Sequence, residues 1–105
     1  MGNEELYAAM DKLTREILAI EKLRGKLVDL FVRKNTDYGN DQIVEFGEFG
    51  ILVRSTDKLN RLKNLVGKDK RLVSDETLDD TWEDLAIYAF IALLLRKGYF
   101  NDVRS

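Results

Sequence analysis

The stretch that decides the fold is DETLDDTWEDLAIYAFIALLLRKG, residues 75–98. Its second half, Leu85–Leu95, is apolar on every side of a helix, so we expect a central and buried helix. This helix should begin near residue 74 or 75 and end near Lys97, with Gly98 as the left-handed residue that stops it. The apolar run is too short to span a membrane.

Two further helices are predicted before this one. Residues 4–33 carry apolar side chains at steps of three, four or seven, which is typical of an amphipathic helix. That apolar series is Leu6, Met10, Leu13, Ile17, Ile20, Leu27 and Phe31. The segment KNTDYGND, residues 34–41, has the composition of a turn. A further helix is predicted over residues 42–66. Gly47 and Gly50 weaken its first half. If the helix broke at Ser55–Thr56, these residues would cap a second segment.

These patterns predict an all-α protein, a single domain over residues 1–105 with three main helices in an antiparallel bundle. Two partner helices in a chain of 105 residues cover a helix as apolar as Leu85–Leu95 only in part. We therefore expect a homo-oligomer, a dimer or a tetramer, to complete the bundle.

Composition excludes several kinds of chemistry. The chain has no Cys and no His, which excludes disulfides, thiolate nucleophiles, Ser-His-Asp catalysis and His or Cys metal ligands. A metal site would need oxygen ligands, which suit Mg, Mn or Ca. The net charge of −2 lacks the basic excess of a general nucleic-acid binder. The polar, acidic N-terminus is unlike a signal peptide, so a cytoplasmic protein is expected, in the host cytoplasm if a phage encodes it.

Five carboxylates share one face of the third predicted helix: Glu76, Asp79, Asp80, Glu83 and Asp84. Like charges at this spacing repel one another. A solvated face near the start of the helix explains Glu76 and Asp79. Asp84, however, lies more than two turns after the start of the helix and adjoins the apolar run. The alternative is that Asp80 and Asp84, one turn apart, hold a divalent cation that offsets their repulsion.

A simple hairpin of the second and third helices predicts which residues face one another. With the turn at residues 67–74, Asp57 lies opposite Asp84, and Arg61 lies opposite Asp80. Asp57 is therefore a candidate metal ligand, although it would also serve as a helix N-cap. Glu48 would lie roughly 13 Å further along, at about 1.5 Å per residue.

Cationic and aromatic residues lie beside these acids. Arg54, Lys58 and Arg61 share a helix face and would neutralise phosphate oxygens, or they would form ordinary ion pairs with the acids. The predicted turn also carries residues that would stack on and hydrogen-bond a base, unless it is a plain turn. These turn residues are Lys34, Asn35, Asp37 and Tyr38.

Four stretches of the sequence resemble known families. IVEFGEFGIL (43–52) and the acid–x–x–x–Asp–Leu pattern downstream resemble the MazG-like all-α NTP pyrophosphohydrolase superfamily. KNTDYG (34–39), VRSTDKLNRLKNL (53–65) and DETLDDTWEDLAIYA (75–89) are similar to the phage-borne nucleotide-modification-associated domain. The similarity to this domain covers about residues 30–95. The resemblance to the MazG-like superfamily implies Mg ligands at Glu45 and Glu48.

The resemblance to the superfamily has departures. When the superfamily's Glu-x-x-Asp motif is aligned, Asp84 takes the Asp position and Thr81 takes the Glu position. Asp80 would then replace the missing Glu as a metal ligand. A literal Glu-x-x-Asp also occurs at Glu76 and Asp79. Glu45 and Glu48 reach Asp80 and Asp84 only if the second helix bends or a second subunit contributes.

The function that the resemblance implies is Mg- or Mn-dependent hydrolysis of a (deoxy)nucleoside triphosphate to the monophosphate and pyrophosphate, in phage nucleotide metabolism or modification. The metal ligands would come from Glu45, Glu48, Asp57, Asp80 and Asp84. With no His in the chain, Glu48 would act as the base that orients or deprotonates water. The alternative is a non-catalytic helical module that binds a nucleotide or another protein.

Overall fold

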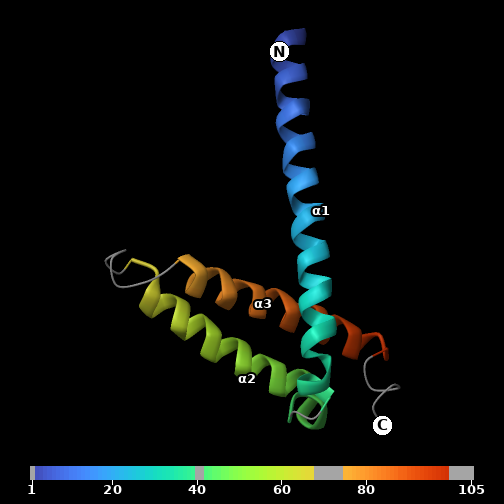
Figure 1. Ribbon diagram of the computed structural model, residues 1–105, viewed down its shortest axis with the longest axis vertical. Coiled ribbons are helices and arrows are strands. Elements are labelled where there is room, and N and C mark those ends of the chain that lie inside the picture. Colours follow the sequence, from blue (N-terminus) through green and yellow to red (C-terminus); the bar gives the residue numbers. More distant parts are fainter. Residues whose placement is uncertain (1, 40–41, 68–74, 100–105) are drawn as a thin grey trace. The chain divides into compact units, whose positions relative to one another are not determined.

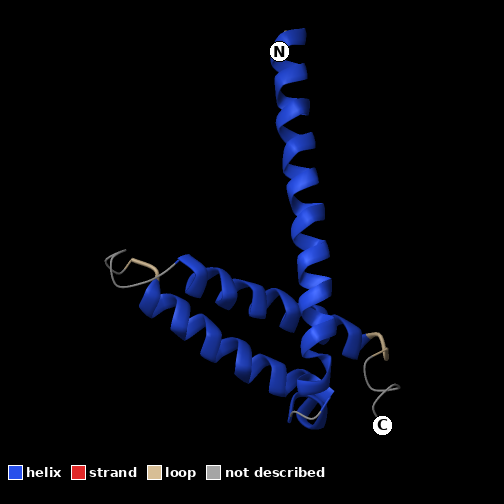
Figure 2. Cartoon of the chain, viewed as in Figure 1, coloured by secondary structure: helices blue, strands red, loops and turns tan. Residues whose placement is uncertain are grey.

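The computed structural model describes residues 2–39, 42–67 and 75–99, and the side chains of 35–39, 42–45 and 75–76 lie outside this description. Three helices account for nearly all of the described residues: α1 (Asn3–Gly39), α2 (Gln42–Leu65) and α3 (Asp75–Arg96) (Figure 1). No strand occurs among the described residues (Figure 2). The all-α prediction is confirmed.

The chain divides into two compact units, residues 1–32 and 33–105. The first unit is the N-terminal part of α1. Its large apolar side chains are exposed, and Ile17, for example, is 49% exposed. The second unit contains the last turns of α1 and the whole of α2 and α3. Within the described ranges, no helix is both long and apolar enough to cross a membrane.

The core of the second unit lies between α2 and α3, which run antiparallel side by side (Figure 1). Ile87 and Ile91 of α3 are fully buried, and Ile51 and Leu62 of α2 are 3% and 4% exposed. Fully burying each such side chain stabilises the fold by about 1.5–3 kcal/mol before entropy is counted. The predicted hairpin of the second and third helices is therefore confirmed.

The apolar half of α3 buries only part of its circumference in the single chain. Ile87, Tyr88 and Ile91 are buried, whereas Phe90 is 42% and Leu93 is 53% exposed. The expectation of a helix buried on every side is therefore wrong for one chain, because α2 covers only one face of α3. Oligomerisation remains a prediction.

The predicted turn at residues 34–41 is wrong for its first part. Helix α1 continues through Gly39, while residues 40 and 41 lie outside the described residues. Asn, Thr, Asp and Gly each weaken a helix by a few tenths to about 1 kcal/mol relative to Ala. With no Pro in the chain, every residue keeps the N–H that the helix needs, so these penalties do not stop it.

Helix α2 bends at Gly47 and not at Ser55–Thr56. Gly47 has φ 59° and ψ −141°, a combination that is almost restricted to glycine. Thr56 stays within the helix, where its hydroxyl donates a hydrogen bond of 2.9 Å to the carbonyl of Leu52. The bend therefore redirects the residues before Gly47 and leaves Glu48 onward on the straight part that packs against α3.

The end of α3 matches its prediction. Gly98 has φ 80°, its N–H bonds to the Leu95 carbonyl at 3.1 Å, and the N–H of Tyr99 bonds to the Leu94 carbonyl at 3.0 Å. These two bonds form a Schellman motif, in which a left-handed glycine satisfies the last carbonyls of a helix.

Replacing Gly47 tests the bend. We expect Gly47→Ala to lower the free energy of unfolding by about 1–3 kcal/mol, because a Cβ disfavours this backbone conformation even though the surrounding space is open. Gly25→Ala is the matched control, because Gly25 lies inside regular helix with open space around it and should be unchanged or stabilised. Thermal unfolding followed by circular dichroism measures both. Equal stability of Gly47→Ala and the wild type would contradict the bend.

Candidate functional site

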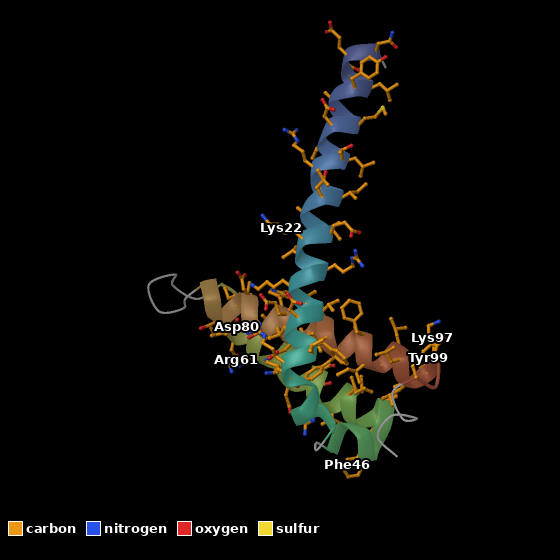
Figure 3. All side chains as sticks on the ribbon, turned by 45° about the vertical axis from the view of Figure 1, so that its right-hand side comes forward. Lys22, Phe46, Arg61, Asp80, Lys97 and Tyr99 are labelled. Atoms are coloured by element: carbon orange, nitrogen blue, oxygen red, sulfur yellow. The ribbon has the colours of Figure 1, made fainter. Side chains whose placement is uncertain are left out.

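The hairpin of α2 and α3 places a group of charged side chains along one side of the two helices. Arg54, Asp57, Lys58 and Arg61 of α2 and Tyr88 of α3 line an open cavity of about 360 Å³. On α2 these residues follow helical spacing, so one face of the helix presents all four. Figure 3 shows Arg61 on α2 and Asp80 on the neighbouring α3.

Asp84 is held by two lysines and is only partly exposed. Its Oδ2 accepts from Lys58 Nζ at 3.0 Å, and its Oδ1 accepts from Lys34 Nζ at 3.3 Å. The side chains of Asp84 and Lys58 are 19% and 27% exposed. Asp57 was predicted to lie opposite Asp84, and the residue that contacts Asp84 is its neighbour Lys58. This contact supports the interpretation of Lys58 as an ion-pair partner.

Glu48 lies at a different level of the hairpin. Both of its carboxylate oxygens accept from Arg96 Nη1, at 3.0 and 3.2 Å, in an exposed ion pair. Arg96 is twelve residues after Asp84 on α3, which is roughly 18 Å along a helix. The bend at Gly47 precedes Glu48 and so does not carry it toward Asp84. Within one chain, Glu48 and Asp84 are therefore not brought together.

The described residues do not assemble a ready-made metal centre. No group of three or more Asp or Glu side chains among them is arranged to hold a metal ion. Asp57 lines the cavity, Asp80 is exposed on α3, and the carboxylate of Asp84 forms ion pairs with two lysines. The side chains of Asn35, Asp37, Tyr38 and Glu45, all predicted site residues, lie outside this description.

Thr81 occupies the position where the superfamily resemblance places a metal-binding Glu, and it is buried. Its side chain is 3% exposed, and its hydroxyl donates a hydrogen bond of 2.9 Å to the Thr77 carbonyl within α3. The predicted substitute, Asp80, is exposed, whereas Thr81 is buried. The Glu-x-x-Asp ligand pair is therefore not reproduced at residues 81 and 84.

An apolar hollow adjoins the charged cavity and was not among the predicted site residues. Phe46, Phe49, Gly50 and Val53 line it, and Arg54 lines both hollows. Phe49 is 70% exposed and Phe46 is 55% exposed, and Figure 3 shows Phe46 at the bent end of α2. Two phenylalanines three residues apart in a weakened helix were the available sequence signal for this hollow.

The comparisons with known proteins identify a domain family. Residues 34–95, more than half of the chain, match the model of the family described as nucleotide modification associated domain 1. The chain matches no curated protein and no solved structure in these comparisons. The matched range begins at Lys34 and includes α2, α3 as far as Leu95, and every described residue of the two hollows.

The ion pairs of Asp84 lead to a stability prediction. We expect Asp84→Asn to lower the free energy of unfolding by about 1–2 kcal/mol, because two lysines lose their counter-charge. This loss lies between those found when exposed and when buried ion pairs are broken. Asp80→Asn, on the exposed side of the same helix, is the control and should change it by less than about 0.5 kcal/mol. Urea unfolding measures both. The lysine contacts are refuted if the two variants are equally stable.

Proposed function

Because the chain belongs to the nucleotide modification associated domain 1 family, we propose that it binds a (deoxy)nucleoside triphosphate at the cavity between α2 and α3. The observation that carries the proposal is the gathering of Arg54, Lys58 and Arg61 on one cavity wall. Charge-assisted hydrogen bonds from guanidinium and ammonium groups are the usual way in which proteins hold phosphate oxygens.

The two adjoining hollows suit the two ends of a nucleotide. The charged cavity would take the phosphates, and the apolar hollow with Phe46 and Phe49 would take the base by stacking. Arg54 lines both hollows and would lie between base and phosphates. The turn residues Asn35, Asp37 and Tyr38 stay in the proposal as further contacts to the base.

Magnesium enters this proposal with the nucleotide, as part of the substrate. Mg²⁺ in proteins is usually held by one or two carboxylates together with substrate phosphates and water, so a three-carboxylate cage is not required. Asp57 is the described carboxylate that lines the cavity. Asp80 and Asp84 on α3 and the pair Glu45 and Glu48 on α2 remain proposed ligands, the latter pair from a second copy of the chain.

Hydrolysis to the monophosphate and pyrophosphate is the proposed reaction, as the MazG-like resemblance implies. A carboxylate base, with Glu48 as the candidate, would orient the attacking water. The second candidate function is nucleotide binding without catalysis. The observation that favours it is the ion pairing of Asp84 with Lys34 and Lys58, which occupies the carboxylate that the reaction would need.

Binding is tested by calorimetry with a panel of NTPs and dNTPs in the presence of Mg. We expect Arg61→Gln to weaken the affinity for the nucleotide about ten- to a hundredfold, because one charge-assisted hydrogen bond contributes about 1.5–3 kcal/mol. Lys63→Gln is the control, since Lys63 is an exposed cation of the same helix that does not line the described cavity. The binding site is wrong if both variants bind like the wild type.

Release of pyrophosphate separates the two candidate functions. If the domain hydrolyses the nucleotide, we expect Asp57→Asn to reduce the rate on the order of a hundredfold, about 2.7 kcal/mol of barrier, while binding is retained. Glu48→Gln should have a similar effect only if a second copy contributes to the site. Tight binding of a nucleotide with no pyrophosphate released from any of the panel, in Mg or Mn, would establish the non-catalytic module.

A further inference from the structure

The apolar side chains of the N-terminal unit follow a heptad repeat. Their spacing alternates between four and three residues, which averages 3.5 and is the period of a left-handed coiled coil. The two seam positions are filled by Leu6, Met10, Leu13, Ile17, Ile20, Arg24, Leu27 and Phe31. Seven of these eight residues are apolar, and Arg24 is the exception.

This stripe is exposed along most of its length. Leu6, Met10, Leu13, Ile17 and Ile20 are between 47% and 60% exposed, which is unusual for consecutive seam positions. Soluble proteins rarely leave contiguous apolar surface of this extent uncovered, and such patches mark interaction sites. The stripe lies outside residues 34–95, so it belongs to a part of the chain that the family match does not cover.

The area of the stripe suits a dimer of two copies. Burying a Leu or Ile side chain removes roughly 60–120 Å² from water. Five half-exposed seam side chains from each of two copies, with the less exposed Leu27 and Phe31 and flanking residues such as Tyr7 and Val28, would bury on the order of 1,000 Å². This is the size at which a specific protein interface becomes stable.

The charges of the stripe select the orientation of the second copy. Two parallel helices in register would place Arg24 against Arg24 in the seam and Glu16 beside Glu21, and like charges at such positions are destabilising. An antiparallel pair centred between Leu18 and Ala19 avoids both contacts. It pairs Leu6 with Phe31, Met10 with Leu27, Leu13 with Arg24, and Ile17 with Ile20.

In this arrangement Arg24 has acidic neighbours. Within its own chain its guanidinium already pairs with Glu21. In the second copy it would face Leu13, and Glu16 lies one helical turn away from Leu13 on the same helix. We therefore propose that residues 6–31 form an antiparallel two-stranded coiled coil with the same residues of a second copy of this chain. The contact is symmetric, because each residue and its partner exchange roles across a two-fold axis.

The first test is sedimentation of the full chain at micromolar concentration. We expect the wild type to be at least a dimer, and Ile17→Asp, in the middle of the seam, to weaken the dimer on the order of a hundredfold. Leu18→Asp is the matched control, because Leu18 is 64% exposed on the same helix but lies off the seam. A monomeric wild type, a dimer that survives Ile17→Asp, or equal dissociation of both variants would overturn the proposal.

The second test measures orientation. The chain has no Cys, so Ala8→Cys offers a single site for a spin label on the outer face of the helix. The antiparallel pair separates the two labels by about 30 Å along the helix axis, whereas a parallel pair places them at the same level. Electron–electron distance measurement gives the answer. A short distance would overturn the antiparallel arrangement, and circular dichroism of each variant monitors whether its helices are retained.

Discussion

The packing of α2 against α3 is the constraint on which the rest of the second unit depends. Ile87 and Ile91 of α3 have no exposed surface, and Ile51 and Leu62 of α2 are buried as well. With no disulfide possible and no metal centre among the described residues, this apolar contact is the main source of tertiary stability that the hairpin has. It also places Arg54, Asp57, Lys58 and Arg61 beside Tyr88, because the buried face of α2 fixes where its charged face lies.

Much of this arrangement could be predicted from the sequence. Helix periodicity predicted the three helices, although α1 ends at Gly39 and not near residue 33. Equal distances from the turn placed Asp57 opposite Asp84, one residue away from the Lys58 that pairs with it. Local composition was misleading at residues 34–39, where several weak helix formers do not end α1. Turn residues indicate a possible break, but in a chain without Pro the continuous hydrogen-bond ladder of the helix outweighs them.

The candidate site was less predictable, because sequence spacing does not show which partners a charge finds. Asp84 was expected to hold a metal, and it pairs instead with Lys34 and Lys58, which are 50 and 26 residues away in the chain. Glu48 was matched by motif to the same site, but it pairs with Arg96 further along α3. The structure brings the predicted cations Arg54, Lys58 and Arg61 to one cavity, whereas their roles and those of the metal ligands remain predictions.

The burial of Thr81 bears on how this site could change during evolution. A glutamate at this position would place a carboxylate where Thr81 is only 3% exposed, at a cost of several kcal/mol unless a cation accompanied it. Thr81 avoids that cost because its hydroxyl is satisfied by a carbonyl one turn earlier in its own helix. A single Thr81→Glu substitution would therefore complete a Glu-x-x-Asp pair with Asp84 only by burying a carboxylate. A new carboxylate on the exposed face that carries Asp80 would avoid that burial.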